Sequence, residues 1–175
     1  MLTYVLIALA AVIAALLAYA ATRPDVFRVE RSASINAPPE KIFALINDYR
    51  NWPSWSPYEK LDPAMQRRLS GAASGQGAVY EWEGNKKIGK GRMEILESSP
   101  SSRITIKLDF FAPFEAHNTA VFTLRPNGGA TDVTWAMHGP APFMAKLMGV
   151  VMNMDKMVGG QFAEGLANMK AVAET

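Results

Sequence analysis

The chain has 175 residues, two histidines and no cysteine, and its net charge is +2 at pH 7. Acidic and basic residues are interspersed without a basic stripe, so no nucleic-acid partner is expected. The lack of cysteine excludes disulfides and thiolate catalysis. Because His117 and His138 lie in different segments, a histidine-rich metal site is also excluded. We therefore expect no metal and no cofactor.

Residues 1–22 form an apolar segment without a charged side chain. A helix of about 20 apolar residues spans the hydrocarbon core of a bilayer, which is roughly 30 Å thick. As an uncleaved anchor with Arg23, Arg28 and Arg31 on its C-terminal flank, it would place the domain on the cytoplasmic side of a bacterial inner membrane. As a signal peptide cleaved near Ala18-Tyr19-Ala20, it would release the domain into the periplasm, but the basic n-region is missing. We favour the single-pass anchor.

Residues 23–26 are interpreted as a short linker, and residues 27–175 as one domain. The alternation of apolar and polar residues over 27–35 predicts a half-buried strand. Asparagine, two prolines and a glutamate at 36–40 then begin a helix that ends near Asp48. A short helical or turn segment at 49–56 carries Trp52 and Trp55. Residues 59–69 are interpreted as an irregular strand after Pro63.

Five more strands are expected in close succession. They cover residues 78–83, 89–97, 103–110, 115–124 and 131–138. The alternation is clearest in 103–110, where every second residue is isoleucine, leucine or phenylalanine. Short turns rich in glycine, proline, asparagine or serine separate the strands, so they form an antiparallel meander with one apolar face. That face requires a covering element.

The covering element is predicted to be one long helix over residues 140–174. Its apolar face repeats every three or four residues through Leu147, Val151, Met154, Val158, Phe162, Leu166, Met169 and Ala173. Gly159-Gly160 interrupts this face, and we expect either a kink there or a close approach to the sheet. The predicted fold class is α+β: a curved antiparallel sheet wrapped around a long C-terminal helix, with an N-terminal transmembrane helix.

This order of elements resembles the START-like (SRPBCC) superfamily, the helix-grip fold of polyketide cyclases and lipid-transfer domains. The resemblance rests on Ile35-x-Ala37-Pro38-x-Glu40-x-Ile42-Phe43, then Ile46, Asp48, Trp52, Trp55 and Pro57, and on Tyr80-x-Trp82-x-Gly84 and Gly89-x-Gly91-x-Met93. It is closest to the bacterial polyketide cyclase/dehydrase and lipid-transport branch, and it covers residues 26–173. It implies a ligand cavity between the sheet and the C-terminal helix.

The residues expected to line that cavity are mostly aromatic or methionine, which suits a lipid or another apolar ligand. They are Trp55, Tyr80, Trp82, Phe110, Asn118, Phe122, Trp135, Met144, Met148 and Met152. The alternative is that these residues simply fill the core. Asn118 is the one polar member, and it could orient a ligand carbonyl or satisfy a backbone group.

The sequence offers no convincing catalytic residue. Glu81, Glu83, His117 and His138 fall on the face opposite the apolar rows, and no nucleophile elbow, phosphate loop or dinucleotide fingerprint is present. The leading hypothesis is therefore membrane-tethered binding of a hydrophobic small molecule, such as a lipid, a quinone or a polyketide-like compound. The alternatives are a cyclase- or dehydratase-type enzyme and a protein-interaction module with a solid core. A protein partner is not identified.

Overall fold

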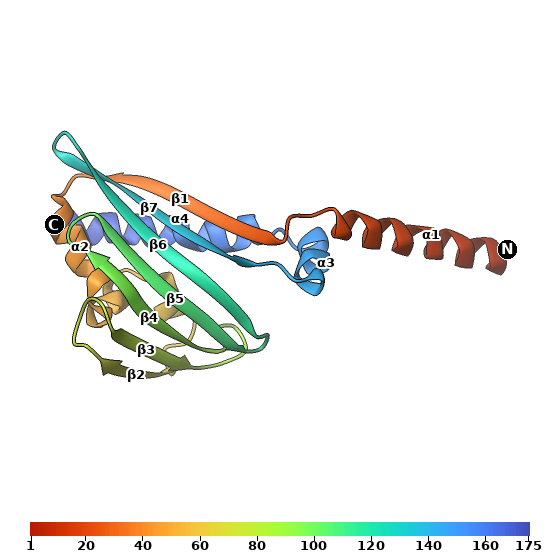
Figure 1. Cartoon of the computed structure of the whole chain (residues 1–175), viewed down its shortest axis with the longest axis horizontal. Helices are drawn as coiled ribbons and strands as arrows, with labels where there is room; N and C mark the ends of the chain where they lie inside the picture. Colours follow the sequence, from red (N-terminus) through yellow and green to blue (C-terminus); the bar gives the residue numbers. More distant parts are fainter.

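Seven antiparallel strands form one curved sheet in the order β1-β7-β6-β5-β4-β3-β2 (Figure 1). The strands are β1 (Val26–Ile35), β2 (Gln66–Gly71), β3 (Ala78–Glu83), β4 (Lys90–Ser99), β5 (Arg103–Ala112), β6 (Ala116–Asn127) and β7 (Ala130–Pro140). The computed structural model describes residues 1–150 and 152–175 in full. Of Val151 it describes the main chain alone, so the predicted place of that side chain lies outside the described residues. The predicted meander is confirmed, with strand ends shifted by up to three residues.

Six helical segments accompany the sheet. They are α1 (Leu2–Ala21), α2 (Pro39–Asn47), the 3-10 helices η1 (Tyr49–Ser54) and η2 (Pro57–Lys60), α3 (Phe143–Val151) and α4 (Met154–Ala173). Helix α4 lies along the sheet and packs mainly against β1. Helix α1 leaves the domain at one end, and α3 sits at that same end beside it (Figure 1). The helix-grip architecture predicted from the sequence is therefore present.

Periodic burial explains why these residues form a sheet with one apolar face. In β5, Ile104 and Ile106 are buried, whereas the next residue, Lys107, is exposed. In β7, Val133 and Trp135 are buried in the same alternating way. An alternating pattern places every second side chain on the same face. Because six of the seven strands, all except the edge strand β2, contribute to this face, α4, α2, η1 and η2 are all needed to cover it.

The predicted single helix over residues 140–174 is wrong in one respect, because the structure has two helices there. Helix α3 ends at Val151, and α4 begins at Met154. Asn153 is the N-cap of α4, and its side-chain oxygen accepts a hydrogen bond from the Lys156 amide at 2.8 Å. Asparagine is among the best N-cap residues, so the start of a helix after Asn153 could have been predicted from the sequence. It was missed because the apolar periodicity continues on both sides of Asn153.

The two glycines do not kink α4, which runs unbroken through them. Gly159 is buried against β1, and a Cβ atom there would lie 2.2 Å from the Arg31 guanidinium. That guanidinium is fixed by Asp155, whose carboxylate accepts at 2.9 Å. Of the two expected explanations, the close approach to the sheet is the correct one.

The irregular strand expected after Pro63 is present as β2. Glu59 belongs to η2, and the strand β2 begins later, at Gln66, as an edge strand that is exposed along its whole length. Edge strands commonly carry charges that discourage pairing with other chains, and Arg67 and Arg68 have that position here.

Helix α1 is the one helix among the described residues that is long and apolar enough to cross a membrane. Its mean hydropathy is 2.5, and only 6% of its apolar window is buried. Length and composition do not by themselves separate an anchor from a signal sequence.

Candidate functional site

Contacting aromatic rings fill the middle of the space between the sheet and α4. Trp135 stacks on Phe162 of α4 with ring centroids 4.1 Å apart and planes 9° apart. On its other side Trp135 contacts Phe122 at 4.9 Å and Trp55 at 5.6 Å. All four rings are buried. Such pairs add about 0.5–1.5 kcal/mol to the burial of their area, so this part of the interior is a packed core.

The ten predicted site residues fall into two groups. Seven lie in or against this core: Trp55, Tyr80, Trp82, Phe110, Asn118, Phe122 and Trp135. The other three, Met144, Met148 and Met152, lie outside it and are 64%, 38% and 43% exposed. Their placement differs from the expectation because the break at Asn153 separates α3 from α4 and lets α3 pack beside α1. A role for any of the ten in ligand binding stays a prediction.

The interior is less completely covered at the end of the sheet where α1 leaves. Phe27 of β1 is paired with Gly139 of β7, and Leu108 of β5 is paired with Asn118 of β6. Phe27, Leu108 and the nearby Phe110 are only partly buried. Gly139 has no side chain to fill the row. The inner face therefore presents partly exposed apolar groups here, in contrast to the closed centre around Trp135.

Asn118 lies in this same region and is incompletely hydrogen-bonded. Its side chain is buried, and its amide nitrogen makes a long contact of 3.9 Å with the Met137 sulfur. The amide oxygen is buried and, among the described residues, has no hydrogen-bond partner. A Cβ atom at Gly139 would lie only 2.3 Å from that oxygen, so the glycine is what allows the amide to lie there. Leaving such an acceptor unpaired costs about 1–3 kcal/mol.

A buried polar cluster that the sequence did not predict lies near the β2 edge of the sheet. One oxygen of the Glu59 carboxylate accepts from the Tyr80 hydroxyl at 2.5 Å, and the other accepts from Arg67 at 2.5 Å. Burial, followed by the hydrogen bond to Glu59, raises the pKa of Tyr80. The three residues come from η2, β2 and β3, and no local spacing reveals their contact. Because both Glu59 oxygens are occupied, the cluster reads as structural support.

The remaining titratable groups that could be catalytic are already engaged in ion pairs or hydrogen bonds. Glu81 has a half-exposed side chain near Arg68, and Asp155 is an exposed partner of Arg31. His117 is 57% exposed; its Nδ1 lies 2.8 Å from Asp109, and its Nε2 lies 3.1 Å from Glu115. Burial pushes the pKa of Asp109 up, but hydrogen bonds from His117 and Lys107 outweigh it and hold that pKa below its ordinary value. Glu81 and His117 alternate with inner-face residues and so lie on the outer face, whereas Asp155 contacts Arg31 where β1 meets α4 and is engaged by that guanidinium.

The contact with Asp109 gives His117 a testable titration. The hydrogen bond to Asp109, then that to Glu115, raises the pKa of His117 above 6.5. Because the pKa of His117 is higher in the folded protein than in the unfolded chain, the contact stabilises the fold fully at a pH below the unfolded-state pKa. This stabilisation is lost as the pH rises through the folded-state pKa. We expect Asp109→Asn to lower the pKa of His117, measured by NMR of the imidazole signals. His138, the second of two histidines, is the internal control, and an unchanged His117 pKa would contradict the contact.

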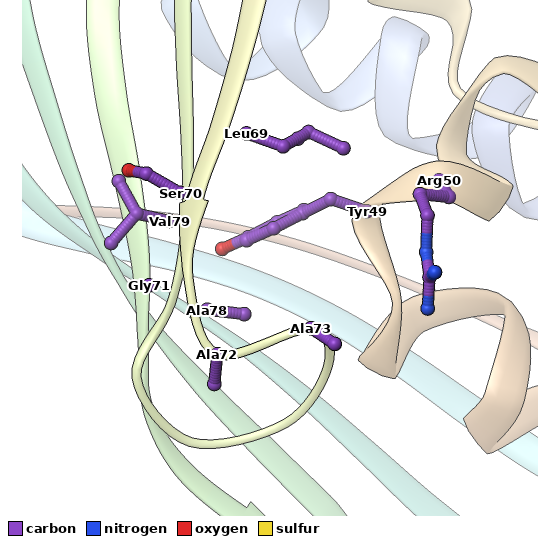
Figure 2. A pocket seen from close by; sticks show the side chains of 9 residues that line it. All are labelled: Tyr49, Arg50, Leu69, Ser70, Gly71, Ala72, Ala73, Ala78 and Val79. Atoms are coloured by element: carbon purple, nitrogen blue, oxygen red, sulfur yellow. The ribbon is translucent and has the colours of Figure 1, made fainter.

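A surface depression of about 220 Å³ lies between η1 and the β2–β3 hairpin (Figure 2). Its lining is largely apolar and comes from Tyr49, Arg50, Leu69, Ser70, Gly71, Ala72, Ala73, Ala78 and Val79. The Tyr49 side chain points from η1 toward the two strands (Figure 2). Its hydroxyl is buried and has no hydrogen-bond partner among the described residues, and burial raises its pKa. The depression is smaller than a typical ligand pocket of about 300–1,000 Å³.

Metal-ligating residues do not gather in the part of the chain that the structure describes. There, no group of three or more histidine, cysteine, aspartate or glutamate side chains is placed to hold a metal ion. The expectation that the protein needs no metal and no cofactor stays a prediction.

Comparison with known families gives one match across the whole domain. A family described as "Polyketide cyclase / dehydrase and lipid transport" matches residues 26–174. This range begins at the first residue of β1 and ends just after α4, so it leaves out α1. No curated protein sequence matches the chain.

Solved structures with the same fold cover most of the chain. A protein of Chromobacterium violaceum has a TM-score of 0.60 at 18% identity, over 87% of this chain and 99% of that one. The di-domain ARO/CYC StfQ from the steffimycin biosynthetic pathway has a TM-score of 0.62 at 11% identity, over 85% and 51%. The Aha1 dimer from Colwellia psychrerythraea has a TM-score of 0.57 at 16% identity, over 85% of this chain and 96% of that one. At such identities the likeness concerns the fold alone.

Proposed function

The chain belongs to the polyketide cyclase/dehydrase and lipid transport family, and from this premise we propose that its domain binds a hydrophobic small molecule at a membrane surface. The ligand class is a lipid, a quinone or a polyketide-like compound. It would bind on the inner face of the sheet at the end next to α1, rather than in the aromatic centre.

The buried, unpaired oxygen of Asn118 carries this proposal. Natural proteins rarely leave such an acceptor without a partner, and a donor on a bound ligand would supply one. The groups around it are apolar and only partly covered: Phe27, Leu108 and Phe110. An apolar surface with one well-placed polar group is typical of sites for small hydrophobic molecules.

The tether is supported by the contact between α1 and the domain. Ala20, in the last turn of α1, is fully buried, and α1 packs against α3. Cleavage at the candidate signal-peptide site would remove these contacts, which favours an uncleaved anchor. The flanking Arg23, Arg28 and Arg31 favour a cytoplasmic domain. Holding the site at the bilayer would raise the effective concentration of a membrane-soluble ligand.

The test is to replace Asn118 without weakening the fold. The full chain is purified from membranes in mild detergent, and bound molecules are identified by native mass spectrometry and solvent extraction. Asn118→Leu removes an unpaired buried acceptor, so the free energy of unfolding should stay level or rise. The affinity for the ligand should fall by about tenfold, the equivalent of one lost hydrogen bond of about 1.4 kcal/mol.

The matched control is Asn127→Leu, the same change at an exposed position of the β6–β7 hairpin. It should leave ligand retention unchanged. Lipids that merely surround α1 would be carried equally by both variants and so would not be mistaken for the ligand. Equal retention by the wild type and both variants would contradict the proposed site.

The packed aromatic centre favours one alternative, a protein-interaction module. The stacking of Trp135 between Phe122 and Phe162 leaves that region solid. If the purified chain carries no apolar molecule and instead retains a protein partner, this alternative replaces the binding proposal.

A further inference from the structure

Exposed apolar side chains gather where the domain meets α1. Around α3 and the start of α4 they are Phe143, Met144, Met148, Met152, Met154 and Met157. Single exposed apolar residues are common on protein surfaces, but a contiguous group of this kind marks an interaction surface. The group lies outside the aromatic core and outside the proposed ligand site.

Helix α3 has almost no polar face. Its sequence FMAKLMGVV contains one charged residue, Lys146. The Lys146 ammonium is paired with the Asp25 carboxylate at 2.5 Å, and only 9% of the Lys146 side chain is exposed. The surface that α3 offers to its surroundings is therefore made of phenylalanine, methionine and alanine.

The place of α3 in the fold indicates what covers this surface. In Figure 1, α3 lies at the end of the domain from which α1 projects, and its axis runs across that of α1. If α1 crosses a bilayer, a helix at its base that runs across it lies parallel to the membrane plane. Apolar helices in that position bury their exposed face in the boundary between headgroups and acyl chains.

Contacts with the residues that follow α1 hold α3 close to the C-terminal end of α1. Besides its ion pair with Lys146, Asp25 accepts a hydrogen bond at its main-chain oxygen from the Ala141 amide at 2.7 Å. Val26 pairs with Pro140 as the first rung of the β1–β7 ladder. Asp25 and Val26 follow α1 by only a few residues, so α3 cannot move far from the membrane-proximal end of α1.

A second apolar feature lies at the same end of the sheet. Phe111 and Phe114, in and beside the β5–β6 loop, are 49% and 68% exposed. The strand register places this loop at the end of the sheet where β7 finishes and leads into α3, and Figure 1 shows it on the side of the domain that faces α1. One bilayer surface can cover apolar side chains from both α3 and the β5–β6 loop.

We propose that α3 and the first turn of α4 form a membrane-docking surface, in which Met144, Met148 and their exposed apolar neighbours enter the lipid interface of the leaflet beside α1. The proposal rests on the membrane tether in the proposed function. Unbranched methionine side chains adapt to an irregular apolar surface, which suits contact with lipid. Docking would hold the Asn118 end of the sheet against the bilayer, so that a ligand could pass directly from lipid to protein.

The chain has no natural cysteine, so single labels test this directly. Met144→Cys, Met148→Cys and Gly129→Cys variants of the full chain are each labelled with the fluorophore NBD. They are reconstituted into vesicles of phosphatidylcholine and phosphatidylglycerol with and without doxyl-labelled lipids. Gly129 is the control, because it lies in the exposed β6–β7 hairpin at the opposite end, where a new Cβ meets no neighbour. Circular dichroism confirms that each variant is folded.

Lipid quenchers should remove about half or more of the emission at positions 144 and 148 and little at 129, as expected for interfacial burial. If the chain floats with the vesicles but labels at 144 and 148 are no more quenched than at 129, docking is overturned while the tether stands. Label self-quenching that depends on protein density would show that a second copy covers the surface, and would also overturn it. If the chain does not float with vesicles, tether and docking fall together, whereas ligand retention is measured separately.

Discussion

Trp135→Ala should lower the free energy of unfolding by about 4 kcal/mol, in the range typical of large aromatic residues deleted from a core. Trp135 contacts Trp55, Phe122 and Phe162, and it is 3% exposed. The cavity left behind would be lined by rings on three sides that cannot collapse into it. Since domains of this kind have a total stability of about 5–15 kcal/mol, the variant should be close to unfolding at physiological temperature.

The measurement is urea unfolding of the full chain in detergent, followed by circular dichroism. Phe114→Ala is the control, because it removes an aromatic ring that is 68% exposed and should change stability by no more than about 0.5 kcal/mol. A Trp135→Ala variant as stable as the wild type would mean that the aromatic centre does not hold the domain together. The expected loss also makes Trp135 unsuitable for testing ligand binding, since folding and binding would be lost together.

Gly165→Leu should destabilise the domain by about 3 kcal/mol, at the upper end of typical overpacking. A Cβ atom at Gly165 would lie 2.7 Å from the Trp135 ring and 3.1 Å from Pro57. Neither neighbour can move aside easily, because the tryptophan is held in its stack and Pro57 begins η2. Helix α4 can thus pack this closely against Trp135 and Pro57 because residue 165 has no side chain.

Gly160→Ala is the matched control in the same helix. A Cβ atom at Gly160 meets no neighbour, so alanine should raise stability by up to about 1 kcal/mol through its better helix propensity. Opposite signs for the two substitutions, in the same unfolding experiment, would establish that packing rather than propensity governs Gly165. Two losses of similar size would contradict this account of α4.

Much of the fold could be predicted from the sequence because local patterns carry it. Alternation fixed the strands of the meander, from residues 103–110 in particular, since side chains on a strand point to opposite faces in turn. Apolar residues that repeat every three or four positions around Phe162 and Leu166 identified the helix that covers the sheet. The apolar segment over residues 1–22 was equally clear. Of the two alternatives expected at Gly159-Gly160, a kink or a close approach to the sheet, the structure has the close approach, where Gly159 meets Arg31.

Only the tertiary structure decided how the candidate site is built. Met144 and Met148 were expected to line the cavity from the start of one long helix, but the turn at Asn153 directs α3 toward α1 and leaves both exposed. The Glu59–Tyr80 contact depends on η2 meeting β3, and the unpaired Asn118 oxygen depends on Gly139 of β7 lying beside it. Sequence patterns report which face a residue occupies within its own element. Which elements meet, and which polar atoms stay unpaired when they do, is fixed by long-range packing alone.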